Sequence, residues 1–241
     1  MIPKKIHYIW LGEKKYALVK QCISSWKRLM PDYEIKCWDA DNIPKHHWVD
    51  EALKQKKWAF ASDYLRLYAL YNEGGIYLDA DVYARKRFDC FLENDFFTAV
   101  EYNEKKFAST NSARLLNEDG SKKNNDAVIG GLTVNSAVIG SVKGSPVILD
   151  AMRYYNENHY IKNKLLLAPD VMALTLENYG FKYRDENQTL LNNGKIYSTD
   201  YFASGIKLFE KSGEKKKSAG GGGGIRYTFI YIHMERLFLY R

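Results

Sequence analysis

The stretch AFASDYLRLYALYNEGGIYLDADVY, residues 59–83, decides the fold because a helical pattern runs directly into a strand pattern. Over residues 58–73, apolar and aromatic side chains recur at intervals of three and four, which predicts an amphipathic helix. The Gly74-Gly75 pair is typical of the end of a helix. Over residues 76–83, apolar residues alternate with tyrosines and aspartates, which predicts a strand with one buried face.

Two carboxylates, Asp79 and Asp81, stand two positions apart in this predicted strand. Strand side chains repeat every two residues, so both project from the same face with Cα atoms about 6.5–7 Å apart. Such a pair is unfavourable unless a cation lies between the carboxylates or water covers them. Hard oxygen ligands suit Mn²⁺ or Mg²⁺, which also bind phosphate oxygens. The pattern therefore predicts a metal site formed by Asp81 and Asp79 that holds a nucleotide diphosphate; a solvated acidic strand end is the alternative.

Asp63 and Arg66 lie one turn apart in the predicted helix and therefore share one of its faces. An aspartate in this place can accept hydrogen bonds from sugar hydroxyls, and an arginine can hold a phosphate through two parallel hydrogen bonds. A surface ion pair without a functional role is the alternative. The acidic strand that follows favours the functional interpretation, so we expect both among the catalytic residues.

The rest of the chain predicts an α/β fold with a mostly parallel central sheet flanked by helices. The N-terminal region reads as a strand at 6–11, a helix at 16–29 and a strand at 34–38, which begins a β-α-β arrangement. A further strand is expected over 132–139. Helices are expected from residue 147 and over 165–180.

Three regions are expected along the chain. Residues 1–210 form a single catalytic domain, which a chain of 241 residues accommodates. Residues 211–224, KSGEKKKSAGGGGG, are typical of a flexible linker, native or engineered. Residues 225–241 are basic and aromatic, which predicts docking on an anionic membrane surface. A terminal helix packed on the domain, or a contact with a partner, is the alternative for this segment.

Composition narrows the class of protein. Hydrophobic residues make up 46% and charged residues 27%, which is ordinary for a folded soluble domain. The net charge of +7 indicates an anionic partner, but the lysines are scattered, so no nucleic acid is expected. Three cysteines without metal-ligand spacing, no signal-like N-terminus and no long apolar run predict a cytoplasmic protein. Docking through the C-terminal segment would make it peripheral on the inner face of the cell membrane.

The 59–83 stretch, the opening IPKKIHYIWLG (residues 2–12) and SWKRLMPDYEIKCWD (residues 25–39) resemble glycosyltransferase family 32. This family of sugar transferases carries a D-x-D motif and includes capsular polysaccharide transferases and mannosyltransferases. The resemblance implies a GT-A type nucleotide-sugar-binding fold, a Mn²⁺ or Mg²⁺ ion, and retention of the anomeric configuration. It also implies a nucleotide-sugar donor, with UDP-sugars favoured over GDP-sugars. The implied acceptor is a saccharide or lipid-linked saccharide in surface polysaccharide synthesis.

The same resemblance implies roles around the nucleotide. Trp10 would stack on the base, and Tyr77 would line the nucleotide pocket. Asp79 would contact the ribose or a metal-bound water, and Asp81 would bind the metal directly. For Trp10, a place in the apolar core is the alternative.

Around the sugars, the resemblance implies that Asp63, Arg66 and Asn135 lie near the donor sugar. For Asn135, a turn-capping role is the alternative. Asp170, in an Ala-Pro-Asp segment where relatives carry Gly-Pro, would lie near the acceptor. In one departure, relatives carry a paired histidine and a Ser-Trp motif near the C-terminus, whereas here His233 is the late candidate.

Two other functions fit parts of the sequence. A hydrophobic strand followed by D-x-D-x-V also marks haloacid-dehalogenase-type phosphatases, in which Asp79 would be the nucleophile. That motif ordinarily lies near the N-terminus, whereas here it follows a long β-α-β prelude and lacks a clear downstream acidic pair. A catalytically degenerate carbohydrate- or membrane-binding module is also compatible with the aromatic content of 15%.

Overall fold

The computed structural model describes residues 1–12, 15–160, 166–202 and 230–232. Its strands are β1 (Lys5–Ile9), β2 (Glu34–Trp38), β3 (Gly75–Leu78), β4 (Val82–Ala84), β5 (Phe96–Tyr102), β6 (Leu132–Val134), β7 (Val138–Ser141), β8 (Gln188–Thr189), β9 (Gly194–Tyr197) and β10 (Ile230–Ile232). Its α-helices are α1 (Ala17–Leu29), α2 (His47–Lys54), α3 (Trp58–Glu73), α4 (Glu104–Ser109), α5 (Pro146–Glu157) and α6 (Ala168–Glu177).

The central sheet is mixed. Its strand order is β2-β1-β3-β7-β5-β9-β8, and β6 pairs with β5. β1 pairs in parallel with β2 and with β3, and β5 pairs in parallel with β9. β7 runs antiparallel between β3 and β5. The α/β class expected from the sequence is confirmed.

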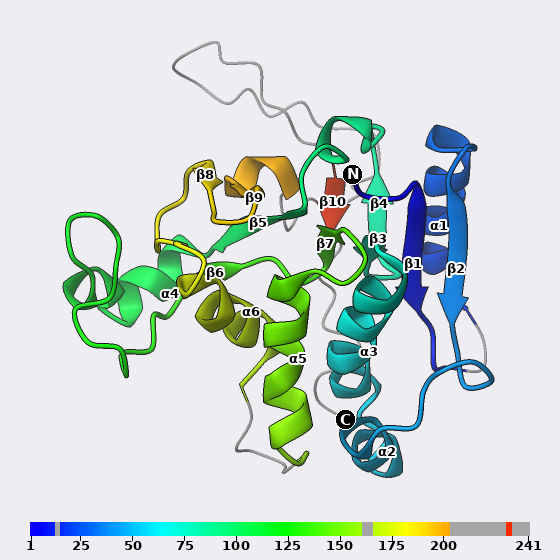
Figure 1. Cartoon of the computed structure of the whole chain (residues 1–241), viewed down its shortest axis with the longest axis horizontal. Coiled ribbons are helices and arrows are strands. Elements are labelled where there is room, and N and C mark those ends of the chain that lie inside the picture. Colours follow the sequence, from blue (N-terminus) through cyan, green and yellow to red (C-terminus); the bar gives the residue numbers. More distant parts are fainter. Residues whose placement is uncertain (13–14, 161–165, 203–229, 233–241) are drawn as a thin grey trace, which may run out of the picture.

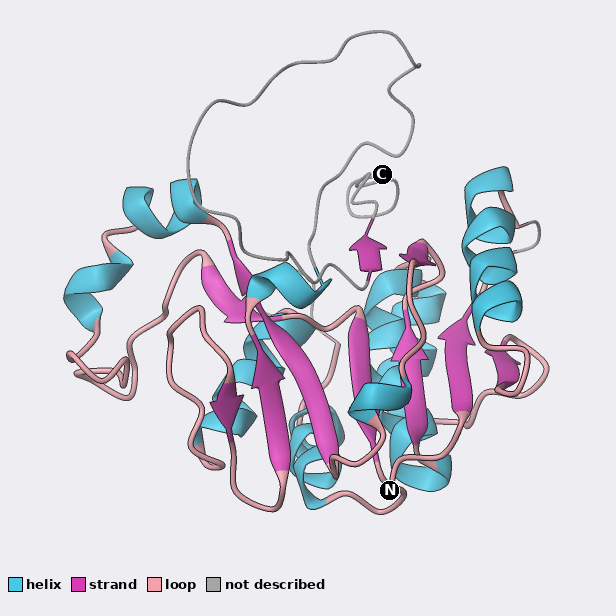
Figure 2. Cartoon of the chain, turned by 90° about the horizontal axis from the view of Figure 1, so that it is seen from above, coloured by secondary structure: helices cyan, strands magenta, loops and turns pink. Residues whose placement is uncertain are grey.

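Helices cover both faces of this sheet (Figure 2). On one face, α2, α3, α5 and α6 pack on a core that includes Tyr77 and Ile139. On the other face, α1 and β4 pack on a core that includes Ile76, Leu78 and Val138. Alternate residues of β3 and β7 therefore enter opposite cores, as the period of a strand requires. Figure 1 shows α3 and α5 side by side on the first of these faces.

The helix α3 has the bounds that the sequence predicted, and it ends where the glycine pair begins. Gly74 has a φ of +65° and Gly75 a φ of +107°, a region that disfavours residues with side chains. A Cβ on Gly75 would lie 2.6 Å from the carbonyl oxygen of Lys5 in β1. The glycines therefore allow the chain to reverse from α3 into β3 against the backbone of β1.

The predicted strand over 76–83 is wrong in one respect, because it is two strands. β3 ends at Leu78, and a tight turn follows in which the Val82 N–H donates to the Asp79 carbonyl oxygen at 2.9 Å. β4 then leaves the main sheet and pairs antiparallel with β10. The strand expected over 132–139 is likewise divided into β6 and β7. Alternation of side chains does not distinguish one strand from two strands joined by a short turn.

Chain direction brings several strand ends to one edge of the sheet. β1 and β3 are parallel, so their C-terminal ends meet, and β7 is antiparallel to β3, so β7 begins at that edge. β5 is antiparallel to β7 and therefore ends there. Trp10 after β1, Asp79 after β3, residues 135–137 before β7 and Glu101 in β5 thus lie along one edge. Ligands of α/β sheets bind at the carboxyl ends of the strands.

The C-terminal regions expected from composition fall largely outside the described residues. The linker 211–224 and His233 lie outside them. Of the segment 225–241, the structure describes β10, which adds a strand to β4 and is not part of a helix. Within the described ranges, no helix combines the length and the apolar character that crossing a membrane requires.

Candidate active site

Arg66 is the centre of a buried polar cluster at this edge. Its Nη2 donates to Oδ1 of Asp63 at 2.9 Å, and its Nη1 donates to the carbonyl oxygen of Ser136 at 2.8 Å. Nη1 also lies 3.6 Å from Oδ1 of Asp79, and the guanidinium carbon lies 4.9 Å from the centre of the Tyr77 ring. Burial lowers the pKa of Arg66, but Tyr77, Asp79 and Asp63 together raise it above its ordinary value. The guanidinium therefore stays charged.

Asp63 accepts a hydrogen bond from Arg66 of the same helix and, when ionised, supplies a counter-charge to it. The two residues are one turn apart, and both side chains are buried. Burial raises the pKa of Asp63 to about 7, although the positive charge of Arg66 opposes this shift. The structure thus brings the predicted pair together as a buried pair, and it is not a surface ion pair. Removing Asp63 would leave Arg66 with Asp79, 3.6 Å away, as its remaining carboxylate partner.

Tyr77 orients Asp79. The Tyr77 hydroxyl donates to Oδ1 of Asp79 at 2.7 Å, and the Asp79 N–H donates to the carbonyl oxygen of Ala137 at 2.9 Å. Burial raises the pKa of Tyr77 well above its ordinary value, so the phenol remains a hydrogen-bond donor. The Asp79 side chain is held on one side by Tyr77 and Arg66 and is 33% exposed. Asp79 therefore presents a fixed carboxylate to the edge of the sheet.

Asp81 lies close to Asp79 in the turn after β3. Burial raises the pKa of Asp81 to about 7, and the negative charge of Asp79 contributes to the shift. The two carboxylates therefore act on one another, as their spacing predicted. A turn brings them together where the sequence pattern predicted a continuous strand.

Asn135 caps the loop before β7. Its Oδ1 accepts hydrogen bonds from the N–H groups of Ala137 at 2.9 Å and Val138 at 3.0 Å, and its side chain is buried. The Thr98 hydroxyl donates to the Asn135 carbonyl oxygen at 2.6 Å. These hydrogen bonds show that Asn135 has the turn-capping role given above as the alternative to a place near the donor sugar. They fix a loop whose carbonyl groups accept hydrogen bonds from the guanidinium of the cluster and from the backbone of Asp79.

Trp10 follows β1 at the same edge and is half-buried. Its backbone N–H donates to the carbonyl oxygen of Trp38 at 2.9 Å, and its ring packs edge-to-face on Tyr16 with centroids 6.0 Å apart. Its indole nitrogen is buried and has no hydrogen-bond partner in the described part of the chain. A buried donor without a hydrogen-bond partner destabilises the folded protein, so a ligand that accepts a hydrogen bond from the indole N–H would be favoured.

Three further residues adjoin the cluster. The pKa of Glu101, near the end of β5, is raised mainly by burial and further by the negative charge of Asp79. Burial also raises the pKa of Asp170, in the first turn of α6. Tyr155 of α5 is buried within electrostatic reach of Asp63. Sequence reasoning missed Glu101 and Tyr155; the available signal for Glu101 was an acidic residue near the end of the apolar run FFTAVEY.

Known proteins resemble this chain in sequence and in fold. An uncharacterized glycosyltransferase of Acanthamoeba polyphaga mimivirus is 32% identical over an alignment of 106 residues, covering 40% of this chain and 42% of the viral protein. The chain thus matches less than half the length of that relative. The solved structure of the PaToxG glycosyltransferase has a TM-score of 0.51 at 22% identity, covering 73% of this chain and 69% of that chain. This likeness confirms the expected GT-A type fold.

A family model described as capsular polysaccharide synthesis protein matches residues 1–204. The matched range includes every residue of the cluster around Arg66. The resemblance to a sugar-transferase family, first seen in the N-terminal motifs, is confirmed. This chain belongs to the capsular polysaccharide synthesis protein family.

Proposed function

We propose that this chain is a metal-dependent, retaining hexosyltransferase that moves a sugar from a nucleotide-sugar to a saccharide or lipid-linked saccharide in surface polysaccharide synthesis. The observation that carries the proposal is the cluster of Asp63, Arg66, Asp79 and Asp81 at one edge of the sheet. Family and fold favour this activity over a phosphatase with Asp79 as its nucleophile.

The cluster suits a sugar diphosphate. Arg66 is a fixed positive charge, and such a charge stabilises the negative charge that develops on a leaving diphosphate. Asp63 and Asp79 provide acceptors for hydroxyl groups of the donor sugar and the ribose. Trp10 lies at the same edge, and its indole N–H has no hydrogen-bond partner among the described residues. This supports binding of the nucleotide base beside Trp10. UDP-sugars are the favoured donors.

A Mn²⁺ or Mg²⁺ ion fits the acidic pair. Asp79 and Asp81 offer carboxylate oxygens, the ligands that these cations prefer. The pKa of Asp81, raised to about 7 by burial and then by Asp79, is typical of a carboxylate pair whose repulsion a cation would relieve. Among the described residues, no group of three or more His, Cys, Asp or Glu is arranged to enclose an ion. A site of this kind needs only one or two carboxylates from the protein, because phosphate oxygens and water complete the coordination of the ion.

The reaction breaks the bond between C1 of the sugar and the diphosphate oxygen, and the diphosphate leaves with the bonding electrons. The acceptor hydroxyl oxygen bonds to C1 from the same face, which retains the configuration, and its proton passes to a phosphate oxygen. A bound divalent cation would neutralise charge on the diphosphate. Arg66 adds a second fixed positive charge, Asp63 holds the donor sugar, and Asp79 holds the ribose.

A panel of UDP- and GDP-sugars with Mn²⁺ tests the proposal. We expect the wild-type protein to hydrolyse at least one UDP-sugar slowly without an acceptor, and to require the divalent cation. Asp81→Asn should abolish this turnover, whereas Asp41→Asn, at an exposed aspartate outside the cluster, should not. Absence of hydrolysis with every donor, or equal turnover in both variants, would contradict the proposal. Binding of a donor without hydrolysis would favour the degenerate binding module.

A place at the inner face of the cell membrane is also proposed, since lipid-linked acceptors lie there. The basic and aromatic composition of 225–241 supports it. Deleting this segment would remove β10 from its pairing with β4, so replacing Arg226, Arg236 and Arg241 with glutamine is the cleaner change. We expect weaker binding of this variant to liposomes that contain anionic lipid. Unchanged binding would discard the membrane proposal and leave the transferase proposal intact.

A further inference from the structure

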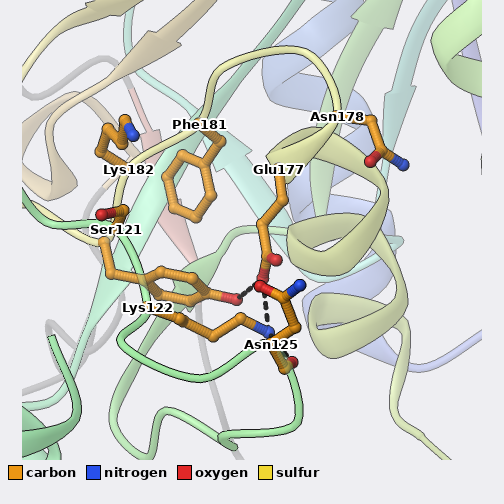
Figure 3. A pocket seen from close by; sticks show the side chains of 8 residues that line it. Ser121, Lys122, Asn125, Glu177, Asn178, Phe181 and Lys182 are labelled. Atoms are coloured by element: carbon orange, nitrogen blue, oxygen red, sulfur yellow. Dashed lines mark hydrogen bonds and ion pairs between the residues drawn. The ribbon is translucent and has the colours of Figure 1, made fainter.

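A cavity of about 420 Å³ lies at the C-terminal end of α6 (Figure 3). One wall is the loop before β6, which contributes Lys122 and Asn125. The opposite wall is the end of α6 and the segment after it, which contribute Glu177, Phe181 and Tyr183. None of these residues belongs to the cluster around Arg66. The volume falls within the range of pockets that bind small ligands.

An ion pair joins the two walls, and its lysine is buried while its glutamate is half-buried. The Lys122 side chain is only 3% exposed, and its Nζ lies 2.9 Å from Oε1 of Glu177. Nζ also donates to the carbonyl oxygen of Asn125 at 2.8 Å. The Tyr183 hydroxyl donates to the same Glu177 oxygen at 2.6 Å. Figure 3 shows Lys122 and Glu177 meeting beside the cavity. Both donors use Oε1, so among the described residues Oε2 of Glu177 is left as an acceptor.

The charges around the cavity cancel. Lys122 is matched by Glu177, and Lys182 pairs with Asp119 at 3.0 Å. A phosphorylated or carboxylated ligand would need an unmatched cation, so this arrangement favours a neutral ligand. Amide, hydroxyl and paired charged groups both donate and accept hydrogen bonds, as a ligand with many hydroxyls requires.

The loop wall is held in place by backbone hydrogen bonds. The Asn117 N–H donates to the carbonyl oxygen of Ser121 at 2.8 Å, and the Tyr183 N–H donates to that of Gly120 at 2.8 Å. Gly120 has a φ of +81°, and a Cβ there would lie 2.6 Å from Cγ of Arg184. The loop is therefore fastened to the segment after α6, and a ligand would bind with little ordering cost.

Phe181 and Tyr183 form the floor of the cavity, with ring centroids 5.1 Å apart and planes inclined by 60°. Both rings are largely buried in the core, with Phe181 3% and Tyr183 7% exposed, so the surface that the cavity offers is chiefly polar. A pyranose ring carries several hydroxyl groups, which such a surface can bind through hydrogen bonds. We propose that this cavity binds a neutral sugar unit of the acceptor or of the growing product chain. The proposal rests on the proposed function, because it takes the acceptor to be a saccharide.

The helix α6 connects the cavity to the catalytic edge. Asp170, in its first turn, lies within electrostatic reach of Glu101, and Glu177 is its last residue. Seven residues of helix span about 10 Å, a distance that a short saccharide covers. A chain held in the cavity would therefore extend along α6 toward Asp170, the residue expected near the acceptor.

The test compares Asn125→Trp with Asn72→Trp. Asn125 is exposed and lines the cavity, and its bond to Lys122 uses its backbone, so a tryptophan there fills space without removing that bond. Asn72 is an exposed asparagine of α3 and gives the matched control. Both variants and the wild type are applied to an array of neutral oligosaccharides, and hydrolysis of nucleotide-sugars is measured in parallel.

We expect the wild type and Asn72→Trp to bind the same glycans, and Asn125→Trp to bind them at least about tenfold more weakly. Hydrolysis of the donor should be equal in all three proteins. Equal glycan binding by all three, or no glycan bound by the wild type, overturns the cavity proposal even where hydrolysis is present. Binding that Asn125→Trp removes, in a protein that hydrolyses no donor, supports the cavity and overturns the proposed function.

Discussion

Arg66 joins α3, the end of β3 and the loop before β7 through one guanidinium group. Its two Nη atoms bond different partners at a fixed spacing, which a planar guanidinium provides and the single nitrogen of a lysine ammonium does not. We predict that Arg66→Lys keeps the charge but lowers turnover of the donor about 100-fold. Arg153→Lys, at an exposed arginine of α5, is the control and should have wild-type turnover. Equal rates in the two variants would show that Arg66 has no part in the reaction.

Asp63 should make stability depend on pH. Burial raises its pKa in the folded protein to about 7, above the value of about 3.9 in an unfolded chain. Between these values the folded state holds a proton that the unfolded state releases, so the free energy of unfolding falls as pH rises from about 4 to about 7. Asp63→Asn removes this titration.

Urea unfolding across that pH range, with EDTA present, measures the difference between wild type and Asp63→Asn. We expect a flatter pH dependence of the free energy of unfolding in the variant. Parallel curves for the two proteins would mean that Asp63 is ionised throughout the range in the folded state.

At the scale of elements, the glycine pair sets how closely α3 and β3 approach β1. Gly75→Ala should lower the free energy of unfolding by about 2 kcal/mol or more, because the φ is unfavourable and the Cβ meets the Lys5 carbonyl oxygen. Gly144 also has a positive φ, +71°, but no atom lies within 4 Å of its Cβ position. Gly144→Ala should therefore cost only about 1 kcal/mol. Equal losses in urea unfolding would show that the contact with β1 adds nothing.

The elements also show why some sequence signals succeed and others fail. The helix over 58–73 was predictable because its periodicity and its glycine stop agree. The end of β3 at Leu78 was not predictable, because apolar and polar residues continue to alternate through the turn that follows. Asp79 and Asp81 were placed together correctly, although the turn, and not a continuous strand, is the physical cause.

At the scale of the whole molecule, the site is assembled by strand direction and helix packing. Asp63, Arg66 and the two later aspartates come from one contiguous stretch, so local patterns were enough to predict that they lie together. Glu101 and Tyr155 reach the cluster through the pairing of β5 with β7 and the packing of α5 on α3, which no local pattern specifies. Asn135 was predicted near the donor, and the structure shows it capping the loop that holds the site.

Asp81 and Asp79 should decide whether this edge of the molecule binds a nucleoside diphosphate through a cation. Isothermal titration of UDP into the protein, once with Mn²⁺ and once with EDTA, measures that coupling directly. We predict that the wild type binds UDP only when Mn²⁺ is present, and that Asp81→Asn shows no Mn²⁺-dependent binding. Equal binding of UDP by both proteins, unaffected by EDTA, would contradict the assignment of the acidic pair as the metal and diphosphate site.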